Sequence, residues 1–324
     1  MSKTMLLAYD FDGKGGGNAI DDIKVASQKI KNSQLAWVHL DARNPQAREW
    51  LENELSYLDP FVVSALLAEE TRPRITEIGD GAIIILRGAN LNLDADPEDM
   101  VSIRMWVDKH RIISVQKRQL KAILDIKERI ENGRGPTDAG HFVTMLITRL
   151  FERIEPVITE LDERTDDIEE KILDDPDLSL RENIIDIRRK AIIFRRYMSP
   201  QKDAIGQLRI SEMEWLSTTQ KRYLYENYDN VLRHVEDLDA IRERAQIVKD
   251  ELANMLSDRL NKNMYVLSVI AAIFLPLGFL TGLLGINVGG IPGADYAYSF
   301  WIFCAILAAI VVGQIIVFKI QKWF

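Results

Sequence analysis

Two long segments at the C-terminal end of the chain contain no charged residue. Residues 263–294 carry no Asp, Glu, Lys or Arg, and residues 296–318 form a second uncharged run of 23 residues, with Asp295 between the two. A helix needs roughly 20 apolar residues to cross the ~30 Å hydrocarbon layer of a bilayer. The sequence therefore predicts two transmembrane helices joined by a short loop, because everything before residue 260 is too charged to span.

The flanking cations predict the orientation of this hairpin. Arg259 and Lys262 precede the first run, Lys319 and Lys322 follow the second, and the loop has no Lys or Arg. The positive-inside rule then places both termini in the cytoplasm. The start of the chain leads into no apolar stretch of signal-peptide length. We expect a multi-pass protein of the cell inner (plasma) membrane.

Composition argues against several classes of protein. The 41 basic and 49 acidic residues give a formal charge of −8, so we expect no nucleic-acid partner. The single cysteine, Cys304, excludes an intrachain disulfide and a zinc cluster built from cysteines of one chain. No paired acid–base or nucleophile pattern is recognisable, so we expect neither an enzyme nor a cofactor.

The first third of the chain has the pattern of an α/β domain. Two short segments, 44–57 and 60–68, have helical spacing. Two hairpins are expected, one turning at Gly79-Asp80-Gly81 and one at Asp108-Lys109-His110. Short β-branched and apolar runs predict a mainly antiparallel sheet, with strands at residues 5–9, 36–40, 81–87, 102–107 and 112–116.

From residue 119 the pattern is helical. We expect helices at 119–132, 137–173, 178–198 and 201–213, with Pro176 and Ser199-Pro200 as breaks. An apolar stripe with steps of three and four then runs from Leu224 to Leu267 without Pro or Gly. It predicts one long helix that continues from the cytoplasm into the first span. A stripe of this length needs packing partners, so we expect an oligomer.

These patterns divide the chain into six parts. The fold class is an α/β cytoplasmic domain with long helices plus a C-terminal two-helix transmembrane hairpin. The predicted parts are the sheet domain 1–117, the helical region with its long stalk helix 118–262, the pore-lining span 263–288, the outer loop 289–295, the second span 296–318 and the cytoplasmic tail 319–324.

The long helix also carries a second row of residues at helical spacing. The row is polar or acidic below the membrane and small or apolar within it, so several copies with this row inward would enclose a tube for a cation. A solvated helix face and tight helix packing at the glycines are the alternative interpretations. The predicted pore-lining residues are Asp250, Asn254, Asn261, Met264, Ser268, Ala271, Leu275, Gly278 and Gly282.

The outer mouth of such a tube would carry carboxamides. Asn287 ends the first uncharged run, and a ring of its oxygens would attract a hydrated cation. Asp295, the acid of the outer loop, would raise the local cation concentration or cap the loop. The four histidines show no ligand-pair spacing, so we assign no metal ligands. A transported ion is expected to pass largely hydrated.

Several motifs resemble the CorA superfamily of divalent-cation transporters. The tripeptide Gly285-Ile286-Asn287 ends the first span and follows a Phe-x-Pro-Leu-x-Phe segment from Phe274 to Phe279. The resemblance implies a funnel-shaped homopentamer whose pore is lined by the first span. A cytoplasmic segment is similar to the family signature as well, through Leu180, Arg181, Arg188, Arg189, Arg195, Arg196 and Pro200.

Two departures narrow the resemblance. The magnesium branch has Gly-Met-Asn and an acidic loop, whereas this chain has Ile286 and the loop Gly289-Gly290-Ile291-Pro292-Gly293. The pattern resembles the zinc-transporting ZntB branch, which implies Zn²⁺ uptake, with proton coupling left open. A Mg²⁺, Co²⁺ or Ni²⁺ channel of the same family is the first alternative. A membrane-anchored sensor or scaffold is the alternative from another class.

Overall fold

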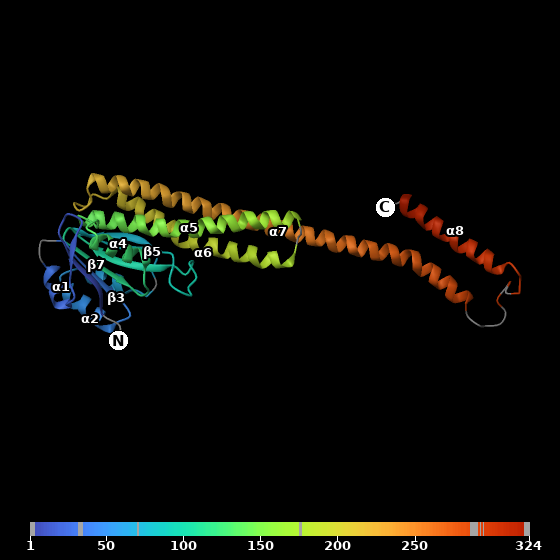
Figure 1. The fold of residues 1–324 in the computed structure, drawn as a ribbon, viewed down its shortest axis with the longest axis horizontal. Coiled ribbons are helices and arrows are strands. Elements are labelled where there is room, and N and C mark those ends of the chain that lie inside the picture. The colour runs from blue at the N-terminus through green and yellow to red at the C-terminus, as the bar shows by residue number, and fades with distance from the viewer. Residues whose placement is uncertain are drawn as a thin grey trace. The chain divides into compact units, whose positions relative to one another are not determined.

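The computed structural model describes residues 4–31, 35–69, 71–174, 177–285, 291, 293 and 295–320. The chain divides into two compact units, Met1–Asp250 and Glu251–Phe324. Figure 1 shows the order of the elements along the chain. The boundary between the units lies within one helix, so each unit is described by itself below.

A seven-stranded sheet forms the centre of the first unit. Its order is β2-β1-β3-β7-β6-β5-β4, and all neighbouring strands pair antiparallel except β3 and β7, which are parallel. The two predicted hairpins are confirmed as β4–β5 and β6–β7. The strands are β1 (Met5–Phe11), β2 (Gly17–Ala19), β3 (Ala36–Asp41), β4 (Arg74–Ile78), β5 (Gly81–Gly88), β6 (Val101–Val107) and β7 (Arg111–Gln116).

Local residues explain both hairpin turns. Gly79 has φ +56°, a conformation that favours glycine, between β4 and β5. In the turn of β6–β7, the carboxylate of Asp108 accepts hydrogen bonds from the backbone N–H of His110 and Arg111, both at 2.9 Å. These turns fix the strand register, because a slip by one residue would exchange the two faces of each strand.

Helices cover both faces of the sheet. Short helices pack on one face, where alternate residues such as Val38 and Leu40 join the buried core. On the other face, Trp37 meets Phe142 of a long helix at a ring-centroid distance of 4.9 Å. The helices of this unit are α1 (Ile23–Lys29), α2 (Pro45–Glu54), α3 (Pro60–Leu67), α4 (Lys121–Glu131), α5 (Ala139–Asp174), α6 (Leu178–Ile210) and the first part of α7 (Thr218–Leu284).

The sequence predicted a helix end at Ser199-Pro200, and this prediction is wrong. α6 is 33 residues long and continues through Pro200 to Ile210. Proline removes one backbone hydrogen bond from a helix, but tertiary contacts offset the loss here. The amide of buried Gln201 accepts from the backbone N–H of Arg87 at 2.7 Å and donates to its carbonyl at 3.1 Å. The short elements β2 and α1 were not predicted.

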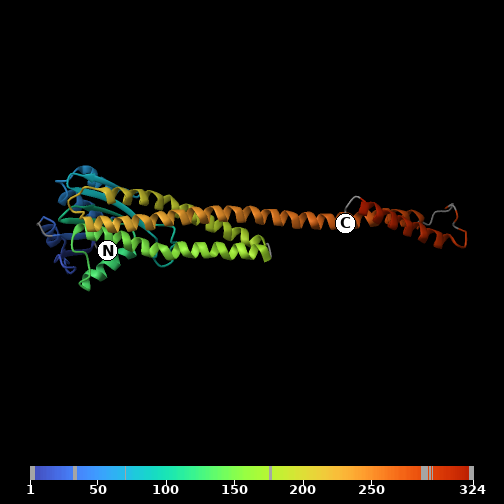
Figure 2. The same cartoon turned by 90° about the horizontal axis from the view of Figure 1, so that it is seen from above.

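The apolar stripe of α7 is buried within its own chain as far as Leu252. α5, α6 and the first part of α7 lie side by side in two perpendicular views (Figures 1 and 2). Polar contacts join them at several levels, including Arg195 with Asp239, and Arg244 with acids of α5. The oligomer argument from the stripe therefore fails for this part, because the chain supplies the partners itself.

A truncation in this stripe tests the helix packing. Leu238 has no exposed surface, so Leu238→Ala should cost about 2–5 kcal/mol of unfolding free energy through lost burial and a cavity. The same helix offers a control in Ile247, which is 57% exposed, so Ile247→Ala should cost less than about 0.5 kcal/mol. Denaturant unfolding followed by tryptophan fluorescence measures both values. Equal costs would contradict the packing of α7 against α5 and α6.

A buried histidine gives the first unit a pH dependence. His39 is fully buried in β3, its Nδ1 lies 2.7 Å from the hydroxyl of Ser114, and burial lowers its pKa to about 4. Between pH 6.5 and 4 the unfolded chain binds a proton that the folded chain does not. Folding stability should therefore fall as the pH is lowered through this window, by up to about 1.4 kcal/mol per pH unit.

His39→Gln should remove this part of the pH dependence and leave a shallower slope of stability between pH 6.5 and 4. Chemical denaturation at a series of pH values measures the two slopes. Superimposable slopes for the variant and the parent chain would show that His39 is not the titrating group.

Candidate functional site

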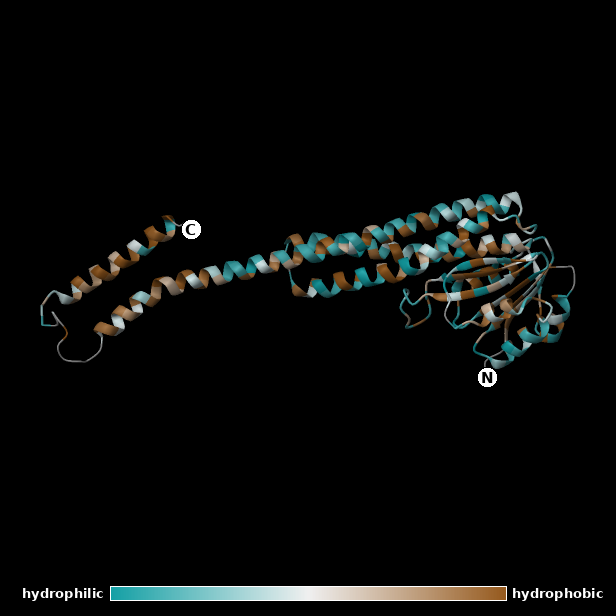
Figure 3. Cartoon of the chain, turned by 180° about the vertical axis from the view of Figure 1, so that it is seen from behind, coloured by the Kyte–Doolittle hydropathy of each residue, from teal (hydrophilic) through white to brown (hydrophobic). Residues whose placement is uncertain are grey.

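The second unit consists of two apolar helices. The end of α7 and α8 (Ser299–Ile320) belong to the two helices long and apolar enough to cross a membrane, by length and composition. In Figure 3 both segments are mostly coloured as hydrophobic. Many large apolar side chains here are exposed in the single chain, among them Met264, Leu275 and Trp301. These surfaces need lipid or protein partners.

One face of α7 in this unit packs toward α8. The side chain of Gln314 on α8 donates a hydrogen bond to the backbone carbonyl of Ala272, at 3.1 Å. Around Ala272, partly or fully buried positions recur at steps of three and four. They are Val269, Ala272, Ile273, Pro276, Leu277 and Leu280. This spacing defines the α8-facing side of the helix, because residues three and four apart share one helix face.

The predicted pore row lies nearly opposite that side. At ~100° per residue, its membrane part is rotated by roughly 150° from the α8-facing side. The chain itself therefore leaves the whole row uncovered, below and within the apolar segment. The exposed residues of the row are Asp250, Asn254, Asn261, Met264, Ser268, Ala271, Leu275, Gly278 and Gly282.

Local contacts differ along the row. The carboxylate of Asp250 accepts a hydrogen bond from Gln246 at 2.7 Å and lies 3.6 Å from Lys249. Gly278 and Gly282 have open space where a Cβ would stand. Thr281, which the sequence reasoning passed over, turns its hydroxyl back to the carbonyls of Leu277 and Gly278, at 2.9 and 3.1 Å. Because Gly278 and Gly282 have no side chain, α7 projects least at these two positions of the row.

The mouth of the predicted tube is partly outside the described residues. Gly285 follows α7, and its N–H donates to the carbonyl of Gly282 at 3.3 Å. Ile286 and Asn287 lie outside the described residues, so their predicted role stays a prediction. Asp295 is exposed in the turn before α8.

The histidines lie apart in the structure. His39 is enclosed in the sheet. His234 on α7 is buried beside Phe151, and burial lowers the pKa of its ring. Within the described part of the chain, no group of three or more His, Cys, Asp or Glu residues could hold a metal ion. Cys304 is partly exposed on α8.

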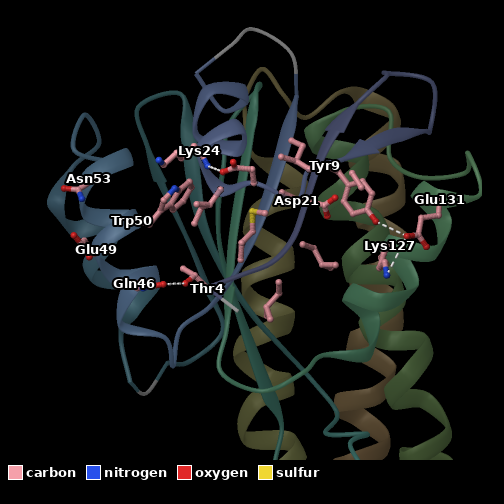
Figure 4. Close-up of a pocket in the computed structure, with 18 residues that line it drawn as sticks. Thr4, Tyr9, Asp21, Lys24, Gln46, Glu49, Trp50, Asn53, Lys127 and Glu131 are labelled. Carbon is pink, nitrogen blue, oxygen red and sulfur yellow. Dashed lines mark hydrogen bonds and ion pairs between the residues drawn. The ribbon is translucent and has the colours of Figure 1, made fainter. Parts of the chain in front are cut away.

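A groove in the first unit was not predicted. It has a volume of about 1140 Å³ and lies between α2, β1 and α4 (Figure 4). The hydroxyl of Tyr9 donates to Glu131 at 3.1 Å, and burial raises the pKa of Tyr9 to about 12. Glu131 also lies 3.6 Å from Lys127. Four acids, Asp21, Asp22, Glu49 and Glu131, and two lysines, Lys24 and Lys127, line the groove.

Known proteins resemble the chain over nearly its full length. A model of the family described as CorA-like Mg2+ transporter protein matches residues 32–319. The divalent cation transporter CmaX of Pseudomonas aeruginosa is 36% identical over 321 residues, covering 98% of this chain and 96% of that protein. The zinc transport protein ZntB of Pectobacterium carotovorum is 36% identical over 317 residues, covering 98% and 95%.

Solved structures agree on the fold. The structure of full-length CmaX superposes with a TM-score of 0.87 at 35% identity, covering 100% of this chain and 99% of that one. The cytoplasmic domain of ZntB from Vibrio parahaemolyticus matches 79% of this chain and all of that one, with a TM-score of 0.69 at 26% identity. The CorA magnesium transporter from Methanocaldococcus jannaschii shares the fold at 17% identity, with a TM-score of 0.80 over both full chains.

Proposed function

Because this chain belongs to the CorA-like Mg2+ transporter family, we propose that it carries divalent cations across a membrane, through a conduit walled by α7 of several copies. The observation that carries the proposal is the uncovered row on α7. Its residues are exposed, they lie opposite the α8-facing side, and the row changes from polar to small and apolar along the helix. One chain cannot enclose a tube with a single helix face, so the conduit requires an assembly.

Five copies are the proposed number in the assembly. The CorA-like resemblance implies a homopentamer, in which five α7 helices surround an axis and α8 packs outside them. The α8-facing side of α7 supports this arrangement, because Gln314 and its neighbours leave the opposite side free for other copies. The exposed apolar residues of the second unit would then contact neighbouring chains or lipid.

The flanking charges support the proposed membrane topology. Arg259 and Lys262 precede the apolar part of α7, and Lys319 lies at the end of α8. The positive-inside rule places these cations, and with them the first unit, on the cytoplasmic side of the bacterial inner membrane. The turn with Asp295 would then face outward, where its carboxylate attracts cations to the mouth.

Zn²⁺ is the proposed ion, and uptake is the proposed direction. Relatives that match 98% of the chain carry zinc transport or divalent cation transport in their names. Asn287 would supply carboxamide oxygens at the outer mouth, where a ring of them binds an ion through its water shell. Met264 and Leu275 would form apolar constrictions that open and close by wetting. A proton gradient is the proposed driving force.

Two competing functions are distinguished by transport. A Mg²⁺, Co²⁺ or Ni²⁺ channel would keep the assembly and change the ion. A membrane-anchored sensor or scaffold would need no conduit, and it offers no reason for Asn287 beside two turns of small residues. Transport of any divalent cation by the purified protein removes the second competitor.

Asn287→Ala should abolish Zn²⁺ uptake into proteoliposomes, because the ring that gathers the hydrated ion is lost. Uptake is measured with Zn²⁺ and Mg²⁺ side by side, with and without a pH gradient. The variant should keep an assembly mass of about five times the 37.1 kDa chain mass. Wild-type rates would argue that Asn287 is not the filter, and a monodisperse dimer would exclude the conduit.

Gly278→Leu should block flux, because a leucine on each copy would fill the narrow part of the conduit. Nothing lies within 4 Å of a Cβ built at Gly278, so the single chain should fold normally. Gly313 on α8 is the matched control, since it also has open space at its Cβ. Gly313→Leu should retain flux. Equal flux in Gly278→Leu and the parent chain would mean that this face points away from the axis.

A further inference from the structure

A proline opens the backbone of α7 within its apolar part. Pro276 lies inside the helix and has no N–H, so the carbonyl of Ala272, four residues earlier, loses its helical partner. A backbone carbonyl without a partner is costly in a bilayer, where water cannot replace the lost bond. Proline is tolerated in a membrane helix when a neighbouring group satisfies the freed carbonyl.

Gln314 of α8 is that neighbouring group. Its Nε2 donates to the carbonyl of Ala272 at 3.1 Å, across 42 residues of sequence. Only the NH₂ end of a glutamine side chain can donate to a carbonyl, so this contact fixes the orientation of the amide. The Oε1 atom is buried and has no partner among the described residues. The side chain of Gln314 therefore satisfies the carbonyl of Ala272, while its own acceptor, Oε1, is left without a hydrogen bond among the described residues.

The contact lies at the level of the proposed conduit. Ala272 and Pro276 face α8, whereas Leu275 and Gly278, on either side of Pro276 in the sequence, belong to the uncovered row. Proline is a common origin of helix kinks, and a kink here would move the row beyond it. The direction of Gly278 and Gly282 thus depends on how the turn at Pro276 is held.

We propose that Gln314 is a positioning residue that clamps α8 to the proline-opened turn of α7 and so sets the position of the glycine-containing end of the uncovered row. Its effect on flux rests on the proposed function, whereas the clamp itself does not. A Gln314 that merely fills space between two helices would act in the same way whether or not residue 276 is proline. If Gln314 satisfies the freed carbonyl, its effect should instead depend on whether residue 276 is proline.

Four proteins separate these roles: the parent chain, Gln314→Met, Pro276→Ala and the double variant. Methionine keeps the length and approximate volume of glutamine but has no N–H donor. Pro276→Ala restores a backbone N–H for the carbonyl of Ala272, so that Gln314 is no longer needed there. Each full-length protein is reconstituted in the same lipid. Resistance to unfolding in SDS and Zn²⁺ flux at equal protein amounts are measured.

In the proline background, Gln314→Met should shift the unfolding equilibrium by about 3- to 15-fold, the range measured for hydrogen bonds between membrane helices. Zn²⁺ flux should also fall, and by more than it does for the packing change Leu307→Met on α8. In the Pro276→Ala background, the same substitution should change both readouts by less than about twofold. Leu307→Met, a donor-free packing change on α8, should have the same small effect in both backgrounds.

Equal effects of Gln314→Met in the two backgrounds would overturn the clamp, as would an unchanged unfolding equilibrium in the proline background. The positioning role would be overturned if the effect of Gln314→Met on unfolding depended on Pro276 while the Zn²⁺ flux of Gln314→Met equalled that of the parent chain. The unfolding readout needs no ion. A protein that transports nothing but shows the coupling would therefore contradict the proposed function and leave the clamp in place.

Discussion

The continuity of α7 imposes one constraint on the whole chain. α7 is a single helix of 67 residues. Its first part has to bury an apolar stripe against other helices, and its last part has to present apolar side chains on most of its surface. In the first part, α5 and α6 cover the stripe up to Leu252, and polar contacts such as Thr148 with Asn227 set the register. In the last part, α8 covers one side only.

The difference between the two parts shows which surface is left for assembly. The stripe that first suggested an oligomer is already covered within the chain, whereas the row in the second unit is exposed and packs against none of the described residues. The case for several copies therefore rests on Met264 to Gly282 rather than on Leu224 to Leu252. The acids of α5, which meet Arg244 at 2.8 and 2.7 Å through Asp162 and Glu169, belong to packing within the chain.

The sequence was informative where a local rule decides the structure. Hairpin turns at Gly79 and Asp108, and the apolar stripe of α7, were predicted because turn residues and periodicity act over a few positions. The end of α6 was predicted wrongly, because the contacts of Gln201 with β5 outweigh the local effect of Pro200. The parallel pairing of β3 with β7 joins residues some 75 positions apart, and no local pattern specifies it.

The contact of α8 with the turn at Pro276 shows why the candidate site was only partly predictable. The uncovered row follows from helical spacing, so the sequence was enough to propose it. The role of Gln314 depends on which carbonyl lies within reach, and that is a tertiary fact. A sequence signal existed, since Gln314 is the one amide side chain in the uncharged run 296–318. Its partner could be found only once α8 was seen to face Ala272 and Pro276.

The chemistry of the row also limits how the proposed conduit could select an ion. Residues 263–294 contain no His, Cys, Asp or Glu, the side chains that bind Zn²⁺ tightly. Conduction needs binding weak enough for the ion to leave, and carboxamide oxygens around a hydrated ion meet that need. Discrimination between Zn²⁺ and Mg²⁺ in this segment would then depend on the size and stability of the water shell. A conduit whose width is set by Gly278 and Gly282, held in place through Gln314, would make helix position the determinant of selectivity.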